Sequence, residues 1–249
     1  MRHSNRSGYN QDNNTDGCYF KPEGGKNKII EFFIELGEYF VLRQDIILQR
    51  FYEHVWLSGL AILITGIIAV PTGVFITRKK KIANFVINLT SIMYTIPALA
   101  LFGLFITIPG LGIGTTSALV ALVVYGLLPL VRNTYVGIME VDPAILEAAE
   151  GMGTTKLQRL LMIELPLAFP VILAGFRTMT VMTIAVTTIA SFIGAGGLGS
   201  LIMRGIHTVN NMMILAGALP VAFIAITAEL TLGYFEKTLR RRVAPPRNQ

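Results

Sequence analysis

The chain has 249 residues, of which 53% are hydrophobic and 14% are charged, whereas a soluble domain has about 25% charged residues. With a mean hydropathy of +0.59, this composition excludes an ordinary soluble enzyme and indicates a protein that crosses a membrane several times. The net charge of +6 does not indicate a nucleic-acid partner, because the basic residues cluster beside hydrophobic runs, where they set membrane orientation.

The N-terminal part of the chain is more polar than the rest. Residues 1–28, rich in Asn, Gly, Asp and Ser, are predicted to form a disordered polar tail. In residues 29–52, apolar side chains recur at near-helical spacing, but Glu31, Glu35 and Glu38 interrupt them. We expect an amphipathic helix that lies along the membrane surface, against the next span or on a partner subunit.

Residues 53–236 are predicted to form the transmembrane domain of an all-α protein. A helix of about 20 apolar residues spans the hydrocarbon core of a bilayer. Five segments meet this length, at about residues 56–77, 83–107, 115–136, 168–190 and 212–235. Pro71 is expected to kink the first of them, and a turn-forming cluster around Pro109 separates the second from the third.

The basic residues predict how these spans are oriented. The two alternate loops carry only Arg204, whereas the loops after the first and third spans and the tail at 237–249 carry Arg78, Lys79, Lys80, Lys81, Lys156, Arg159, Lys237, Arg240, Arg241, Arg242 and Arg247. Cytoplasmic loops carry the excess of Lys and Arg. We therefore expect the N-terminus outside, and the C-terminus and the 142–166 loop in the cytoplasm.

The 142–166 loop is the longest polar break in the second half of the chain. Asp142 is placed as the N-cap of a first short helix, followed by a proline. Two glycines interrupt this helix, and Thr154 or Thr155 then caps a second one over 156–164, which a proline closes. From the residues alone, the pair of helices is either a docking surface outside the lipid or an ordinary amphipathic loop.

The spacing within this loop resembles the EAA signature of ABC-importer permeases. The matching positions are Glu147, Ala148, Ala149, Gly153, Ile163, Leu165 and Pro166, with Gly151 in the same glycine elbow. In that family the loop is cytoplasmic and docks in a cleft of the ATP-hydrolysing subunit. The resemblance implies that Glu147 holds the elbow or contacts the ATPase, that the alanines permit close packing, and that Gly153 supplies the turn.

Further runs are similar to one group within that family, the betaine, carnitine and choline importers. These runs are Tyr94–Ala100, Tyr125–Thr134, Glu164–Ala168 with Pro170–Arg177, and Ile193–Gly199. The resemblance covers about residues 55–235 and implies a MetI-like core of about five spans in the inner (cytoplasmic) membrane. Its implied partners are two ABC ATPase subunits, a second permease chain that is identical or paralogous, and a separate extracytoplasmic binding protein. Amino-acid importers such as the methionine type are the alternative.

Four residues are candidates for the translocation pathway. Charges inside a bilayer are costly and tend to be paired or to face water, so Arg177 and Glu229 are hypothesised to face the inner mouth of a pathway, near each other. Snorkelling to the interface is the alternative. Tyr94 could hold a quaternary ammonium group by a cation–π contact. Thr187 and the glycine-rich segment 191–199 either line a polar path or allow tight helix packing.

Other functional classes lack the residues that they need. A membrane-embedded enzyme requires clustered His, Asp or Ser side chains at a membrane face, and a metal site requires ligand spacing that His54 and His207 do not have. A channel acting alone needs no docking loop. The sequence has no Walker motif, so ATP is expected on partner subunits, and no catalytic residue, cofactor or metal is expected on this chain.

Overall fold

The computed structural model describes residues 25–243, and within that range the chain is built from helices. The elements, in chain order, are α1 (Gly25–Leu42), α2 (Gln44–Ile76), α3 (Lys80–Thr95), α4 (Ala98–Ile106), α5 (Thr115–Met139), α6 (Pro143–Gly151), α7 (Lys156–Arg159), the π-helix η1 (Leu160–Glu164), α8 (Leu165–Ala190), the 3-10 helix η2 (Ser191–Ile193), α9 (Gly199–His207) and α10 (Asn211–Val243). The all-α prediction is therefore confirmed for the described residues.

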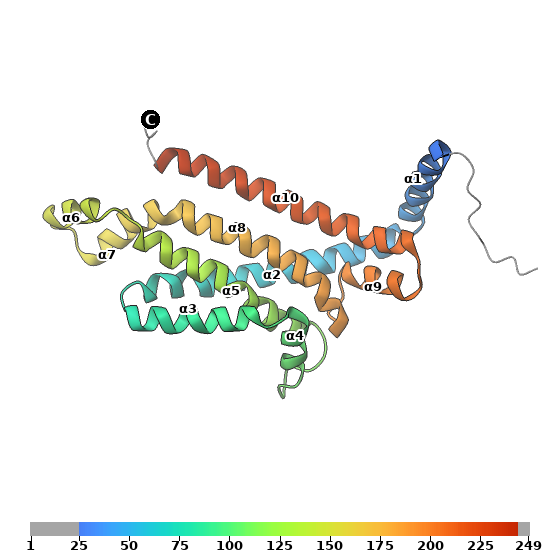
Figure 1. The fold of residues 1–249 in the computed structure, drawn as a ribbon, viewed down its shortest axis with the longest axis horizontal. Coiled ribbons are helices and arrows are strands. Elements are labelled where there is room, and N and C mark those ends of the chain that lie inside the picture. The colour runs from blue at the N-terminus through green and yellow to red at the C-terminus, as the bar shows by residue number, and fades with distance from the viewer. Residues whose placement is uncertain (1–24, 244–249) are drawn as a thin grey trace, which may run out of the picture.

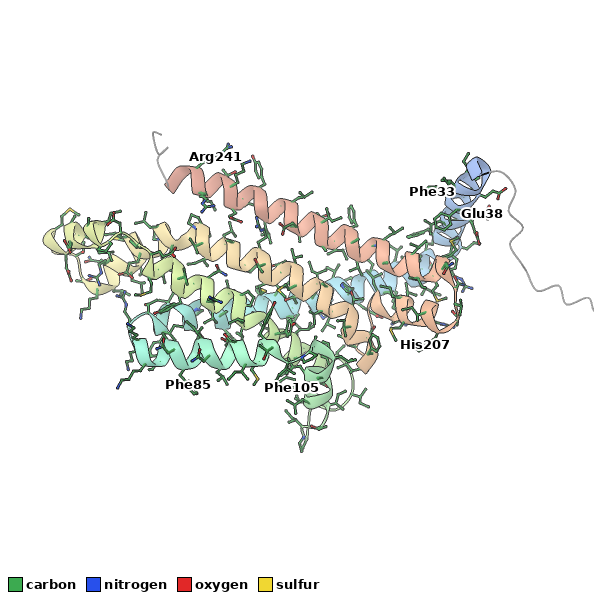
Figure 2. All side chains as sticks on the ribbon, viewed as in Figure 1. Phe33, Glu38, Phe85, Phe105, His207 and Arg241 are labelled. Carbon is green, nitrogen blue, oxygen red and sulfur yellow. The ribbon has the colours of Figure 1, made fainter. Side chains whose placement is uncertain are left out.

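The N-terminal boundaries differ from the predicted ones. Residues 1–24 of the predicted tail lie outside the described residues, and 25–28 already belong to α1. The predicted amphipathic helix over 29–52 is divided, because α1 ends at Leu42 and the following residues continue into α2. Phe33 and Glu38 project from opposite sides of α1, as an amphipathic helix requires (Figure 2). The predicted contact of α1 with the membrane surface stays a prediction.

Within residues 25–243, four helices are long and apolar enough to cross a membrane: α2, α5, α10 and a continuous run over residues 156–193 that contains α8. The predicted second span is not one straight helix, because α3 and α4 meet at an angle of 98°. Proline disfavours helical backbone at the residue before it, and Ile96, which precedes Pro97, is extended with ψ 128°. Helix α4 therefore leaves the line of α3 at one end of the bundle (Figure 1).

The end of the 142–166 loop also differs from the prediction. Pro166 was expected to close the second short helix, but α7, η1 and α8 run on as one helical stretch. A proline removes a donor and crowds the carbonyl four residues earlier. Here the turn before it is widened into a π-helix, in which the Leu165 N–H donates to the Leu160 carbonyl. The wider turn accommodates the proline without ending the helix.

Helix α5 lies in the middle of the bundle and packs against α2, α3 and α8. Small residues allow the closest approaches. A Cβ added at Gly73 of α2 would lie 2.5 Å from the Thr134 Cβ of α5, and one added at Gly175 of α8 would lie 2.5 Å from the Asn133 Cβ. Helices in membranes associate through such small residues because lipid provides no hydrophobic drive between them.

The two ends of the bundle carry different features. Helices α6 and α7 extend from one end, where the last turn of α10 also lies, whereas α1 and α9 are at the opposite end (Figure 1). The predicted topology requires the 142–166 loop and the C-terminal end of α10 to share a side. Their relative placement agrees with that requirement, while the side of the membrane stays a prediction.

Candidate functional site

The first helix of the 142–166 loop begins as its sequence predicts. The Ala144 N–H donates to the Asp142 side chain at 2.9 Å, and Pro143 is the first helical residue. Glu147 and Ala148 are exposed on α6, whereas Ala149 is buried with 1% of its surface exposed. The two alanines therefore have different surroundings: Ala149 packs inside the loop, and only Ala148 is available to a partner.

The glycine elbow is centred on Gly153. Its φ is +80°, in the left-handed region that favours glycine. The Gly153 N–H donates to the Glu150 carbonyl at 2.9 Å, and the Thr154 hydroxyl donates to the Ala149 carbonyl at 2.8 Å. A Cβ at Gly153 would meet no atom within 4 Å, so the constraint is conformational and not steric. Gly151 ends α6 with ordinary helical backbone.

The second helix begins with a capping box that sequence reasoning identified only in part. Of the two threonines considered, Thr155 is the N-cap, and its hydroxyl accepts from the Gln158 N–H at 3.3 Å. The Gln158 side chain accepts in return from the Thr155 N–H at 2.9 Å. Glutamine three residues after a threonine was the available signal. This reciprocal pair fixes where α7 starts relative to the elbow.

Large apolar side chains gather on the exposed surface of the loop. They are Ile145, Met152, Leu157, Leu161 and Met162, of which Met152 is the most exposed, at 77%. Several large exposed apolar side chains on a segment outside the bundle are typical of a protein–protein interface. Together with Glu147 and Ala148, they form a surface suited to docking.

An ion-pair network ties the loop to the bundle, and we call it the loop cluster: Arg78, Glu150, Arg159 and Glu164. Arg78, in the turn after α2, places its Nη2 2.9 Å from the Glu164 Oε2, and the Arg159 Nε lies 3.0 Å from the Glu164 Oε1. The Arg159 Nη1 also lies 3.1 Å from the Glu150 Oε1. Glu164 is 3% exposed, so water can do little to stabilise its charge. The two arginines compensate that charge instead.

Sequence reasoning missed the loop cluster. Its one visible signal is that Glu164 is an isolated acid within an otherwise apolar run. The remaining signature residues lie around it: Ile163 and Leu165 are half-buried, and Pro166 is exposed. Leu165 packs against the core residues shared by α2, α5 and α8. These residues anchor the end of the loop, while their role in ATPase coupling stays a prediction.

A second network, which we call the bundle cluster, joins α8 to α10: Arg177, Glu229 and Glu236. The Arg177 Nε lies 3.5 Å from the Glu229 Oε1, so the predicted proximity of these two residues is confirmed. Glu236, which sequence reasoning missed, is closer, at 2.8 Å from the Arg177 Nη1. Gly233 leaves room for this guanidinium, because a Cβ there would lie 3.2 Å from it.

The other two pathway candidates lie inside the bundle. The rings of Tyr94 and Tyr125 stack with centroids 4.8 Å apart, and the Tyr94 hydroxyl lies 3.2 Å from the Met182 sulfur. Thr187 is fully buried and donates to the Thr183 carbonyl at 2.7 Å. The stacked tyrosines are half-buried, whereas the Thr187 hydroxyl is already satisfied by its own helix.

The glycine-rich segment 191–199 lies at the end of the bundle opposite to the 142–166 loop, and it packs tightly. Gly196 and Gly197 have φ near +80°, at +79° and +77°. The Gly197 N–H donates to the Glu53 carboxylate at 3.0 Å, and a Cβ at Gly199 would lie 2.0 Å from the Thr188 carbonyl oxygen. His54, beside this segment, is buried with its Nε2 3.2 Å from the Ile184 carbonyl oxygen. These contacts favour the tight-packing interpretation.

Residues 66–244 match the family described as the binding-protein-dependent transport system inner membrane component. The chain belongs to this family. It is accordingly a multi-pass permease subunit of the inner membrane and not an enzyme. The match begins within α2 and includes the whole 142–166 loop, so α1 lies outside it.

Relatives of known name support the narrower resemblance. The carnitine transport permease protein OpuCD of Listeria monocytogenes is 44% identical over 206 residues, which cover 82% of this chain and 92% of the relative. The glycine betaine/carnitine/choline transport system permease protein OpuCD of Bacillus subtilis is 42% identical over 211 residues, covering 84% and 91%. The osmoprotectant import permease protein OsmW of Salmonella typhimurium is 44% identical over 184 residues, covering 73% and 86%.

Solved structures show the same fold. An inward-facing structure of the MetNI methionine ABC transporter contains a chain with a TM-score of 0.70 and 20% identity, and the match covers 78% of this chain and 96% of that one. A crystal structure of an amino acid ABC transporter with histidines gives a TM-score of 0.63 at 21% identity, covering 82% and 96%. At these identities the likeness concerns the fold, and it confirms the predicted MetI-like core.

Proposed function

We propose that this chain is the permease of an ATP-driven importer for a quaternary ammonium osmoprotectant, namely glycine betaine, carnitine or choline. The observation that carries the proposal is the 142–166 loop, in which the signature residues fold into a capped pair of helices with an exposed apolar surface outside the bundle. The names of relatives more than 40% identical favour this substrate class. An amino acid is the alternative substrate, since the fold is shared with a methionine transporter.

In this proposal the loop is gripped by a separate ATPase subunit. Glu147 and Ala148 face the partner, together with the apolar side chains around Met152. Two ATPase subunits would each hold one permease chain of a dimer, and closure on ATP would move both loops. The attached helices would then rotate and expose the cavity between the chains to a separate extracytoplasmic binding protein. ATP is bound by those subunits and not by this chain.

The proposed orientation follows from the distribution of basic residues. The turn between α2 and α3 lies at the same end as α6, α7 and the last turn of α10 (Figure 1), and the sequence of this turn and the start of α3 contains Arg78, Lys79, Lys80 and Lys81. Because cytoplasmic loops carry such clusters, this end is placed in the cytoplasm and the N-terminus outside. In a Cys18→Ser background, a cysteine substituted at Glu150 should then resist a membrane-impermeant maleimide in intact cells, and labelling from outside would overturn the orientation.

The substrate would be handled mainly by its cation. Tyr94 and Tyr125 offer stacked aromatic surface to a trimethylammonium group, and the bundle cluster offers one carboxylate more than its arginine neutralises. These residues are proposed pathway contacts. Thr187 has weaker support, because its hydroxyl is buried and bonded within α8.

Reconstitution tests the proposal directly. The chain would be co-expressed with the ATPase and the binding protein of the same importer, purified as a complex and inserted into liposomes that contain ATP. We expect ATP-dependent uptake of labelled choline, carnitine or glycine betaine, without uptake of methionine. Uptake of methionine alone would favour the amino-acid alternative, and uptake without ATP or without a bound ATPase would refute the importer function.

A further inference from the structure

The carboxylate of Glu164 joins two separate parts of the described chain, the 142–166 loop and the turn after α2. It lies at the end of η1, and its two oxygens receive guanidinium groups from different segments. Arg159 belongs to α7, within the 142–166 loop, whereas Arg78 follows α2, 86 residues earlier in the chain. The loop and the end of the first long helix are thus connected through one side chain.

The surroundings of Glu164 make this connection stiff. Its side chain is 3% exposed, and dissolved salt screens an ion pair less when one partner is buried than when both are exposed. Both arginine contacts are near 3 Å, at 2.9 and 3.0 Å, which is the range of charge-assisted hydrogen bonds. A displacement of α7 and η1 must therefore either break the 2.9 Å contact of Glu164 with Arg78 or carry the turn at Arg78 with it.

We propose that Glu164 is a positioning residue that transmits movement of the 142–166 loop to the cytoplasmic end of α2. This inference rests on the proposed function, since it presumes that an ATPase moves the loop. It adds a second route by which the loop drives the bundle. The first route is direct, because α7 and η1 continue into α8. The second passes from Arg159 through Glu164 to Arg78, so that α2 and α8 move together.

The proposal predicts uncoupling when the connection to Arg78 is cut. Arg78 is 41% exposed, so Arg78→Gln removes the ion pair without opening the core. We expect the purified complex to keep its ATPase subunits and its ATP hydrolysis, while uptake per ATP hydrolysed falls about tenfold, within the usual range for coupling between two sites. Arg78→Lys should recover part of the uptake, because it keeps the charge but loses the planar fork.

Lys79→Gln is the matched control. It removes a positive charge from the same turn, and in the described structure the Lys79 ammonium lies near the Phe75 ring and not near Glu164. Its uptake per ATP should equal that of the unmodified chain. If Arg78→Gln and Lys79→Gln behave alike, the effect is one of net charge and the inference is overturned.

A double-mutant cycle separates the connection from a general structural effect. Glu164→Gln keeps the shape of the side chain and removes its charge. If the two residues act together, Arg78→Gln should cause little further loss in the Glu164→Gln background. Additive losses would overturn the inference, even if each single variant were impaired. Loss of ATPase binding or of ATP-dependent uptake by the unmodified complex would instead refute the proposed function, and this inference with it.

Discussion

The loop cluster and the bundle cluster use the same chemistry at two places, but they are built differently. In the loop cluster two arginines meet two carboxylates, and the shared carboxylate of Glu164 is 3% exposed. In the bundle cluster a single arginine, Arg177, meets two carboxylates, and one of them, Glu229, is 48% exposed. The first cluster is balanced in charge and centred on a buried carboxylate, whereas the second carries an excess negative charge and has no fully buried member.

This difference indicates different tasks. A buried charge is tolerated only when partners compensate it, so the buried Glu164 carboxylate fixes the relative positions of the two segments that supply its arginines. An unbalanced cluster leaves one carboxylate free to interact with water or with a passing cation. We therefore interpret the loop cluster as a mechanical connection and keep the pathway hypothesis for the bundle cluster alone.

The largest effect is expected at the elbow that places the loop cluster. Gly153→Val should abolish uptake while the chain remains in the membrane, because φ of +80° is strained for any other residue by about 1–2 kcal/mol and more for a β-branched one. Uptake assays and membrane immunoblots measure the two quantities. Gly151→Ala is the control, since Gly151 is helical and a Cβ there meets no atom within 4 Å. Normal uptake by Gly153→Val would refute the assignment of this loop to coupling.

A smaller effect, now on stability as well as uptake, is expected in the bundle cluster. Arg177→Leu leaves Glu229 and Glu236 without a cation, which should lower the free energy of unfolding by about 2 kcal/mol, because Arg177 and Glu229 are only partly buried. Thermal unfolding of the purified chain in detergent measures this change. Arg132→Leu is the control, because Arg132 is exposed and takes part in none of the ion pairs among the described residues. Equal melting temperatures for the two variants would show that the bundle cluster contributes nothing.

The smallest effects should separate the two carboxylates of the bundle cluster. Glu236 is 2.8 Å from Arg177 and 16% exposed, so Glu236→Gln should cost about 1–2 kcal/mol of stability. Glu229 is farther away and more exposed, so Glu229→Gln should cost at most about 1 kcal/mol.

Uptake tests the pathway role of the same residues. If Glu229 faces a pathway, Glu229→Gln should weaken uptake of cationic choline more than uptake of zwitterionic glycine betaine. Unaltered uptake by both Arg177→Leu and Glu229→Leu would end the pathway hypothesis.

Local features of the 142–166 loop could be predicted because they depend on neighbouring residues. Asp142 caps α6 through an N–H two residues away, and the Thr155 cap involves a residue three positions later. The turn at Gly153 likewise reflects the backbone freedom of one residue. Pro97 shows the limit of this reasoning. Its effect on the preceding residue is local, but apolar composition alone gave a straight span where the helices turn by 98°.

The sequence by itself determined the all-α membrane class, the family and the capped elbow of the loop, because hydropathy, spacing and capping act over a few residues. Only the tertiary structure placed Arg78 against Glu164 and Glu236 against Arg177, since these partners lie 86 and 59 positions apart (164 − 78 and 236 − 177). Which charges meet depends on how helices pack, and that packing is set by small residues such as Gly73 and Gly175. No local pattern in the sequence encodes it.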